Sequence, residues 1–339
     1  MFIRKLEDKI SIVGAGSWGT TLGVVLSRKG IKVVLHSAFK KENLWMQQKR
    51  ENPFYLKGVK FPSLLEVSPS LKEVLKNKII VVAVPVKFVR KVLEKIKNTK
   101  ISFKDKIFIS VGKGIEEKSL KRVSQIIKEE LKDPSVAVLS GPTIAKEVLE
   151  EIPTACIIAS DDINLAKKLQ VLFNTSTFRV YLHQDVIGVE LGGALKNIIA
   201  IACGISDGLG FGTNTKAAIV NRGLVEISRL GKKLGAEVST FWGLAGLGDL
   251  ITTCFSSYSR NRFVGEEIGK GKKLKDILKD MKMIAEGVET VKSAYKLSKK
   301  FKIEMPITEE VYKVLYRNKP PEKAVKDLTT RPLKKEAIK

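Results

Sequence analysis

A lysine among small and apolar residues is the first candidate for chemistry in this sequence. Lys196 lies in the run GVELGGALKN at residues 188–197, which has the composition of a helix. Gly192 and Gly193 would lie one turn below it, and each glycine inside a helix costs about 1 kcal/mol relative to alanine. Such a pair indicates that another segment approaches the helix closely. A lysine held there would be poorly solvated, which lowers its pKa toward the range where it can exchange protons.

The same lysine also has an ordinary interpretation, because lysine and arginine together number 61 in this chain of 339 residues. Most of those side chains must be solvated surface groups, and the 36 acidic residues leave a formal net charge of +25. The basic residues are spread along the chain, without an arginine-rich arm or interleaved aromatic residues. This pattern favours a diffuse surface charge over steering of an anionic small molecule, and both over specific nucleic-acid binding.

Composition excludes several other classes of protein. The hydrophobic share of 44% and the charged share of 29% are typical of a soluble globular protein. No apolar run approaches the about 18 residues that a membrane span needs, and the charged N-terminus does not resemble a signal peptide. We therefore expect a cytoplasmic protein. Three scattered cysteines, two histidines and no C-x-x-C pair argue against a disulfide framework and against a metal site.

A glycine-rich turn near the N-terminus predicts a dinucleotide site. The run GAGSWG at residues 14–19 follows an apolar stretch at 9–13 and precedes residues 20–29, which have helical spacing. Residues 32–35 then form a second predicted strand. In this context the glycines let the backbone approach a pyrophosphate, and the start of the helix offers free N–H groups and a positive dipole. A tight turn without a ligand is the alternative.

The residues after the second predicted strand bear on the type of cofactor. A site selective for NAD usually has Asp or Glu there to bind the ribose 2′-hydroxyl. Here the first acidic residue is Glu42, and Lys40 and Lys41 precede it. Two lysines could accept a 2′-phosphate, so the sequence favours NADP(H), or the use of both NADP(H) and NAD(H).

The first half of the chain alternates strands and helices, which predicts an α/β domain with a Rossmann-type doubly wound sheet of about seven or eight strands. Residues 42–78 are mixed and predict short helices and an insertion. A helix is expected at 86–97. The further strands are expected at 79–84, 106–111, 136–140, 154–160 and 178–181. Ligands of such sheets bind at the carboxyl ends of the strands, where Lys113 and the turn at 141–145 would lie.

After Asp185 the hydrophobic period changes from that of strands to that of helices, which predicts an all-α C-terminal domain. We expect a dinucleotide-binding domain at residues 1–186 and a helical substrate and catalytic domain at 187–339. The helices are expected at 187–202, 214–234, 287–300 and 306–315, with a glycine-rich loop at 204–212.

Two polar groups in this second half are out of keeping with their surroundings. Asp249 lies in the apolar run GLGDLI at residues 246–251 and needs a partner if it is buried. An ion pair with Lys196 and a helix-capping role are the two interpretations. Residues 259–262, SRNR, read as a helix start with Ser259 as cap, where backbone N–H groups and an arginine suit a phosphate. A capped surface helix with solvated arginines is the alternative.

Taken together, these motifs resemble the bacterial-type NAD(P)-dependent glycerol-3-phosphate dehydrogenases, in order and over nearly the whole chain. The matching runs are GAGSWG at 14–19, SVGKGIE at 110–116, LSGPTIA at 139–145, GVELGGALKN at 188–197, GLGD at 246–249, YSRN at 258–261 and AEGV at 285–288. The resemblance implies reversible reduction of dihydroxyacetone phosphate to sn-glycerol 3-phosphate, which supplies the backbone of phospholipids, and possible assembly as a homodimer.

The resemblance also implies a role for individual residues. Lys196 would be the general acid/base. The implied substrate contacts are Lys113, Gly141, Thr143, Lys196, Asp249, Ser259, Arg260 and Asn261. The implied cofactor contacts are Gly14, Gly16, Ser17, Trp18, Gly19, Phe39, Lys113, Ala145, Arg260, Ile284 and Glu286.

One departure from the family pattern affects the adenosine end of the cofactor. Members commonly have a His-Arg pair after the second strand, and this chain has Ala38 and Phe39 at those positions. The nearest rival enzymes are two-domain dehydrogenases of the 3-hydroxy acid or 6-phosphogluconate type, which the Ser-Arg-Asn and Gly-Pro-Thr motifs fit less well. A non-catalytic nucleotide-sensing or nucleic-acid-binding protein is the rival from another class.

Overall fold

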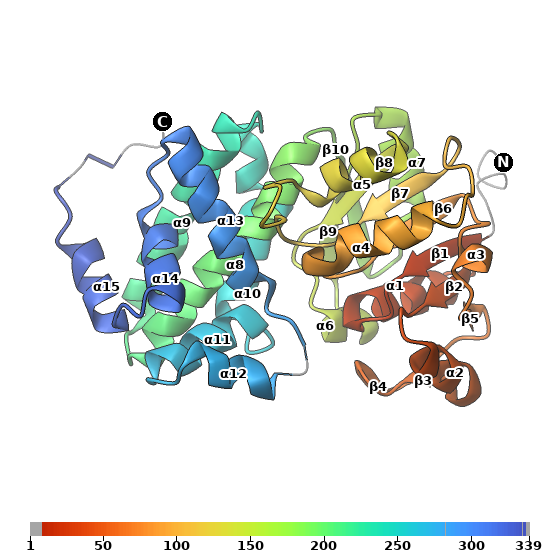
Figure 1. Cartoon of the computed structure of the whole chain (residues 1–339), viewed down its shortest axis with the longest axis horizontal. Coiled ribbons are helices and arrows are strands. Elements are labelled where there is room, and N and C mark those ends of the chain that lie inside the picture. The colour runs from red at the N-terminus through yellow and green to blue at the C-terminus, as the bar shows by residue number, and fades with distance from the viewer. Residues whose placement is uncertain (1–8, 282, 334, 337–339) are drawn as a thin grey trace. The chain divides into compact units, whose positions relative to one another are not determined.

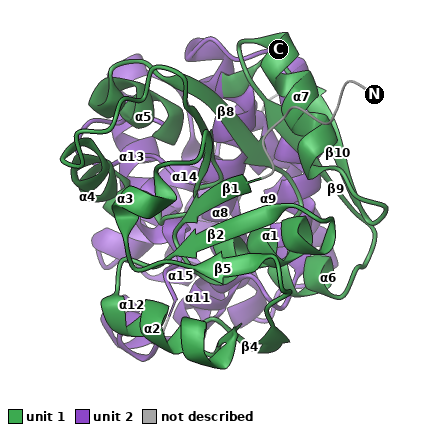
Figure 2. Cartoon of the chain, turned by 90° about the vertical axis from the view of Figure 1, so that its right-hand side faces the viewer, with its two compact units in different colours: residues 1–112, 123–186 green, residues 113–122, 187–339 purple. Residues whose placement is uncertain are grey.

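The structure, a computed structural model, describes residues 9–281, 283–333 and 335–336. It divides into two compact units, shown in different colours in Figure 2. The first comprises residues up to Gly112 and Val123–Val186, and the second comprises Lys113–Arg122 and the chain from Ile187 onward. The segment that begins at Lys113 therefore belongs to the second unit although its neighbours in sequence belong to the first.

The first unit is built on an eight-stranded sheet in the order β10-β9-β8-β7-β6-β1-β2-β5. The strands are β1 (Lys9–Val13), β2 (Lys32–His36), β5 (Leu65–Val67), β6 (Ile79–Val82), β7 (Ile107–Ser110), β8 (Ser135–Ser140), β9 (Thr154–Ala159) and β10 (Phe178–His183). The six neighbouring strands β8, β7, β6, β1, β2 and β5 all run parallel. Strand β9 pairs with β8 in the antiparallel direction. The ends of β1, β2 and β8 thus share one edge, where the predicted ligand-binding turns lie.

Helices cover both faces of this sheet. Successive residues of each strand point to opposite faces, so each strand contributes to two separate cores. On β6, Ile79 and Val81 belong to one apolar core and Ile80 and Val82 to the other. The second core includes residues of α3 (Leu71–Val74), α4 (Val86–Lys97) and α5 (Val123–Leu131). The first includes residues of α1 (Ser17–Arg28), α6 (Ala145–Leu149) and α7 (Ile163–Phe173). The predicted doubly wound α/β fold is confirmed.

The mixed region after β2 contains the elements that the sequence pattern resolved least. It forms α2 (Lys40–Lys49), a hairpin of β3 (Glu51–Asn52) and β4 (Leu56–Lys60), then β5 and α3. The strand β5 was not predicted, because three residues are too few to show an alternating pattern.

The second unit is helical, as predicted. Its elements are α8 (Val186–Gly208), α9 (Thr213–Lys233), η1 (Val238–Trp242), η2 (Leu244–Gly248), α10 (Asp249–Phe255), α11 (Arg260–Gly269), α12 (Leu274–Asp280), α13 (Glu286–Phe301), α14 (Pro306–Tyr316) and α15 (Pro321–Thr329). Figure 1 labels the helices α8 to α15. The large apolar core of this unit draws residues from all of them.

The expected glycine-rich loop at 204–212 is wrong over most of its length, because α8 continues to Gly208. A Cβ atom on Gly204 would lie 1.9 Å from the carbonyl oxygen of Arg262, and one on Gly265 would lie 2.0 Å from that of Ile201. The glycines therefore serve close packing of α8 against α11 rather than a turn. Packing of this kind stabilises the helix in spite of its glycines.

Helix α8 is long and apolar enough to cross a membrane by length and composition, with a mean hydropathy of 1.7 in its best window. Within the structure 94% of that window is buried. A core helix that is buried inside a protein has the same length and composition, and the burial of α8 is that of a core helix in its unit.

Candidate active site

A buried carboxylate joins the two lysines that the sequence singled out. Asp249, at the start of α10, is 1% exposed, and its Oδ1 lies 2.5 Å from Lys196 Nζ. Its Oδ2 lies 2.7 Å from Lys113 Nζ. Of the two interpretations of Asp249, the ion pair is therefore correct, since the N-cap of α10 is Gly248 and Asp249 is the first residue of the helix. Each oxygen of one carboxylate holds one ammonium group.

Thr253 completes this group, and the sequence analysis missed it. Lys196 Nζ donates to Thr253 Oγ1 at 2.6 Å, and this hydroxyl donates to the carbonyl oxygen of Asp249 at 2.7 Å. Thr253 follows Asp249 by four residues, so both lie on one face of α10. That spacing was the available signal. The hydroxyl fixes the direction of the lysine side chain relative to the carboxylate.

The contact between α8 and η2 explains how Lys196 meets Asp249. A Cβ on Gly192 would lie 2.5 Å from the carbonyl oxygen of Ala245, so only glycine permits this approach. Lys196 follows Gly192 by four residues and Asp249 follows Ala245 by four residues. One turn along each segment therefore brings the ammonium and carboxylate groups together. The prediction that a segment lies close to the glycine face of this helix is confirmed at Gly192.

The backbone of Lys113 is held on both sides by side chains of the same unit. Asn197 Nδ2 donates to the carbonyl oxygen of Lys113 at 3.1 Å, and the N–H of Lys113 donates to Glu286 Oε2 at 3.2 Å. Ser293 Oγ donates to the carbonyl oxygen of Ile115 at 2.9 Å. These bonds come from α8 and α13, so two helices position the segment that carries Lys113.

The electrostatics of this group suit proton transfer. Lys196 is 5% exposed, and burial lowers its pKa to about 8. The Asp249 carboxylate acts in the opposite direction and raises this pKa, whereas the positive charge of Lys113 lowers it. A lysine with a pKa near neutrality can both donate and accept a proton at physiological pH.

The predicted helix start at residues 259–262 is confirmed. Ser259 is the N-cap of α11, and its Oγ accepts from the N–H of Arg262 at 3.2 Å. Arg260 is exposed, and its Nη1 donates to the carbonyl oxygen of Ile284 at 2.8 Å. Asn261 is buried and uses its Oδ1 to accept from the N–H of Gly287 at 2.9 Å. Among the residues that the structure describes, Arg260 uses one of its five N–H groups and Asn261 uses none of its amide N–H groups, so the others can meet a ligand.

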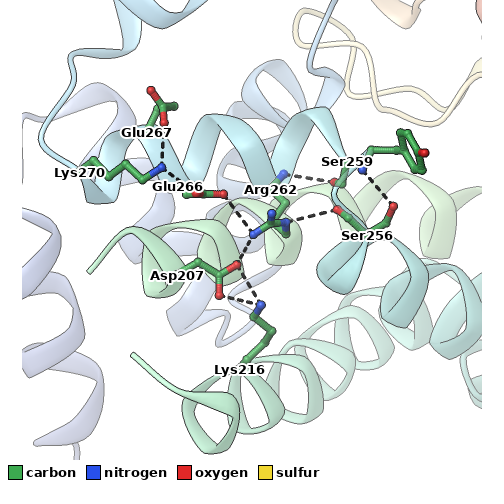
Figure 3. A network of polar contacts seen from close by, with 9 residues as sticks. Asp207, Lys216, Ser256, Ser259, Arg262, Glu266, Glu267 and Lys270 are labelled. Atoms are coloured by element: carbon green, nitrogen blue, oxygen red, sulfur yellow. Dashed lines mark hydrogen bonds and ion pairs between the residues drawn. The ribbon is translucent and has the colours of Figure 1, made fainter. Parts of the chain in front are cut away.

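Figure 3 shows the surroundings of Arg262, the second arginine of this helix start. Arg262 lies 2.5 Å from the Asp207 carboxylate and 3.2 Å from that of Glu266, and its Nε donates to the carbonyl oxygen of Ser256. Lys216 also pairs with Asp207, at 2.6 Å. Arg262 is therefore part of a structural ion-pair network, which leaves Arg260 as the arginine available to a phosphate.

The glycine turn of the first unit fits a dinucleotide phosphate. Gly14 has φ of +117°, and a Cβ there would lie 2.3 Å from the carbonyl oxygen of Ala83. A Cβ on Gly16 would meet no atom within 4 Å, so the turn has open space in front of it. Helix α1 begins at Ser17 with no side-chain cap and no acidic residue in its first turn. Its first N–H groups and positive dipole are thus available to an anion.

The other sequence-predicted residues of the first unit lie on the same edge of the sheet. Gly141 follows β8 with φ of +129°, and Thr143 Oγ1 donates to its carbonyl oxygen at 3.1 Å. Ala145 begins α6, and Phe39, after β2, is 61% exposed. In the described part of the chain, no group of three or more His, Cys, Asp and Glu side chains is placed to hold a metal ion.

Comparison with known proteins agrees with this arrangement. The family profile for the NAD-dependent glycerol-3-phosphate dehydrogenase N-terminus matches residues 9–166, and the profile for the C-terminus matches residues 185–326. The chain is 50% identical to glycerol-3-phosphate dehydrogenase [NAD(P)+] of Thermoanaerobacter sp. (strain X514), over 97% of this chain and 98% of that protein. It is 47% identical to the protein of that name from Citrifermentans bemidjiense, over 98% and 100% of the two chains.

Solved structures show the same likeness. A crystal structure of glycerol-3-phosphate dehydrogenase from Coxiella burnetii is 38% identical and superposes with a TM-score of 0.92, covering 96% of this chain and 99% of that one. The enzyme from Plasmodium falciparum is 26% identical with a TM-score of 0.88, covering 98% of each chain. The chain belongs to the NAD-dependent glycerol-3-phosphate dehydrogenase family.

Proposed function

We propose that this chain catalyses the reversible NAD(P)H-dependent reduction of dihydroxyacetone phosphate to sn-glycerol 3-phosphate. The observation that carries the proposal is the buried group of Lys196, Asp249 and Lys113, in which one lysine has a pKa of about 8. A ketone reduction needs a proton donor and positive charge near the developing alkoxide, and this group offers both.

The nicotinamide cofactor supplies the hydride when it is bound. The glycine turn and the start of α1 would hold its pyrophosphate, because the helix N-terminus has no side-chain cap and the turn before it has open space. The residues of this site are Gly14, Gly16, Ser17, Trp18 and Gly19. The further cofactor contacts that we assign are Phe39, Lys113, Ala145, Arg260, Ile284 and Glu286. The first unit is thus the dinucleotide-binding domain, and the second is the substrate and catalytic domain.

Lys196 acts as the general acid in the reduction and as the general base in the oxidation. Negative charge that forms on the carbonyl oxygen attracts the Lys196 ammonium group, which then donates its proton. Asp249 and Thr253 hold Nζ in one direction during this transfer, and Lys113 adds positive charge beside it.

Arg260 and Asn261 hold the phosphate of the substrate. Ser259 supports them, since its cap begins the helix that carries both side chains. A fixed phosphate orients the carbonyl group, which lowers the entropic part of the barrier. Gly141 and Thr143, after β8, are further substrate contacts in this proposal.

In its cellular role, the enzyme would supply glycerol phosphate for phospholipid synthesis. We also assign it to the cytoplasm, from the composition of the sequence, and infer a homodimer from the family resemblance. Size-exclusion chromatography with light scattering measures the second of these, and a monomer at micromolar concentration would refute it.

Turnover tests the proposal. Reduction of dihydroxyacetone phosphate, followed by loss of absorbance of NADH and NADPH in parallel, should show turnover with at least one cofactor. Oxidation of 6-phosphogluconate with NAD and NADP is the comparison. Turnover of 6-phosphogluconate without turnover of dihydroxyacetone phosphate would assign the chain to the rival dehydrogenases.

A further inference from the structure

The segment Lys113–Arg122 carries one of the two lysines of the candidate active site, and peptide bonds join it to the other unit at both of its ends. Gly112 before it and Val123 after it belong to the first unit. Its lysine, however, contacts the Asp249 carboxylate of the second unit. To keep this contact, the segment must be fastened to the second unit by interactions of its own.

The segment folds back on itself, so that its last residue lies beside one near its start. Ile115 and Arg122 form an isolated antiparallel bridge. Between them, the N–H of Glu116 donates to the carbonyl oxygen of Lys121 at 3.0 Å, and the N–H of Leu120 donates to the carbonyl oxygen of Glu116 at 2.9 Å. A loop closed in this way moves as one piece, so a contact at its last residue also fixes the residues at its start.

Arg122 makes such a contact with α8. Its Nη1 lies 2.5 Å from Glu190 Oε2, and the two side chains are 14% and 4% exposed. Solvent screens an ion pair at this depth only weakly, and removing one partner would leave the other charge buried and unpaired. Glu190 precedes Lys196 by six residues, about 9 Å along the helix axis. The pair therefore ties the segment to the helix that carries the reactive lysine.

The other ion pairs between this segment and the helices are more exposed. Glu117 pairs with Lys292 at 3.3 Å and with Lys296 at 3.2 Å, both on α13. The side chains of these three residues are 37%, 24% and 51% exposed, and pairs of this kind contribute little. We therefore expect the buried pair of Arg122 to provide more of the anchoring than the pairs of Glu117.

We propose that Arg122 is a positioning residue of the reaction, whose ion pair with Glu190 fixes the segment to α8 and so holds the Lys113 ammonium group on Asp249. The inference rests on the proposed function, in which Lys113 adds positive charge beside the proton donor. It goes beyond that function by assigning a role to two residues that act through Lys113. Since the charge of Lys113 lowers the pKa of Lys196, release of the segment should alter turnover and its pH dependence together.

The double variant Arg122→Ala/Glu190→Gln tests this role, since it removes the ion pair without leaving a buried carboxylate unpaired. Its kcat for reduction of dihydroxyacetone phosphate should fall at least about tenfold, because a displaced ammonium group no longer stabilises the developing charge. The kcat/KM for reduction should begin to fall at a higher pH than in the wild type, because Lys196 has lost the nearby positive charge. Arg122→Lys restores a cation opposite Glu190 and should recover most of the wild-type kcat and pH profile.

Glu226→Gln is the matched control, because Glu226 is another buried carboxylate of the second unit. It lies on α9, is 2% exposed, and accepts from the N–H groups of Ile307 and Thr308 at the start of α14. Its replacement removes a buried charge without altering a contact of the segment 113–122. This variant can have a lower Tm, but its pH profile for reduction should remain that of the wild type.

Hydrogen exchange of the peptide that covers residues 113–122, followed by mass spectrometry, measures the anchoring without turnover. The N–H groups of Lys113, Glu116 and Leu120 are hydrogen-bonded in the structure. Their exchange should be at least about tenfold faster in the double variant, because the segment opens more often, and unchanged in Glu226→Gln. Equal exchange in the wild type and the double variant would overturn the inference.

The remaining outcomes separate positioning from stability and from the proposed function. Faster exchange with the kcat and pH profile of the wild type would overturn the inference, since it would show anchoring without an effect on the reaction. An equal shift of the pH profile in Glu226→Gln would also overturn it, because loss of stability would then explain the shift. A wild type that does not reduce dihydroxyacetone phosphate would refute the proposed function, whereas faster exchange in the double variant would leave the anchoring of Lys113 by Arg122 standing.

Discussion

Lys196 and Asp249 form a buried ion pair at 2.5 Å, although 53 residues separate them in the sequence. The pair has a second cation, because Lys113 contacts the other oxygen of the same carboxylate. Removing one partner of a buried ion pair leaves an uncompensated charge and costs about 3–5 kcal/mol. The pair therefore links the stability of the helical unit to the protonation state of its reactive lysine.

Replacing Asp249 by Asn should lower the pKa of Lys196 below its present value of about 8, because the carboxylate raises that pKa. The kcat/KM for reduction of dihydroxyacetone phosphate should then begin to fall at a lower pH than in the wild type. Asp207→Asn is the control, since Asp207 pairs with Arg262 and Lys216 in the separate network of Figure 3. A pH profile that is unchanged in Asp249→Asn would contradict the electrostatic role of this carboxylate.

The two directions of the wild-type reaction should depend on pH with opposite sign. Reduction needs protonated Lys196, so its kcat/KM should fall as the pH rises through about 8. Oxidation of sn-glycerol 3-phosphate needs the neutral amine, so its kcat/KM should rise through the same range. Initial rates at subsaturating substrate between pH 6 and pH 10 measure both. Parallel profiles in the two directions would remove Lys196 as the titrating group.

Gly192→Ala should disturb the active site without altering any of its polar side chains. The new Cβ would lie 2.5 Å from the carbonyl oxygen of Ala245, so α8 and η2 must move apart. We expect a loss of about 1–3 kcal/mol in the free energy of unfolding, with a lower kcat at temperatures where the variant is folded. Denaturant unfolding and turnover at 25 °C check the two effects. Wild-type kcat would show that this contact does not position Lys196.

The patterns that predicted the fold are local ones. Continuous apolar runs predicted the buried strands, and helical spacing predicted α9, α13 and α14. Both signals are local, because the spacing of apolar residues along the chain shows which faces of an element are buried. The predicted loop at 204–212 failed for a non-local reason. Gly204 packs against the backbone of α11, about 60 residues later, and no property of the glycines themselves distinguishes this use from a turn.

The candidate site shows the same limit. The sequence identified Asp249 as a buried polar group. It could not decide between an ion pair with Lys196 and a capping role, because the Gly192–Ala245 contact that brings Lys196 close joins distant segments. Thr253 shares a helix face with Asp249 and could have been found from that spacing. The different roles of Arg260 and Arg262 could not be predicted from spacing, because Asp207, the ion-pair partner of Arg262, lies on another helix.

The two arginines of α11 should separate binding from stability. Arg260→Ala should raise the KM for dihydroxyacetone phosphate about tenfold or more, with a smaller effect on the KM for cofactor and little change in Tm. Arg262→Ala should lower Tm, because the guanidinium pairs with Asp207 and Glu266, and should have the smaller effect on that KM. A larger effect of Arg260→Ala on cofactor than on substrate would refute the phosphate assignment.

Turnover of the Lys196→Ala variant is the most direct test of the account. Loss of the proton donor should lower kcat for reduction of dihydroxyacetone phosphate by at least about 100-fold, while the Kd of the cofactor stays within a few fold of the wild type. Lys216→Ala is the matched control, because Lys216 is also an ion-paired, largely buried lysine of the helical unit. It should retain turnover. Near-normal kcat in Lys196→Ala would contradict the central claim that this lysine transfers the proton.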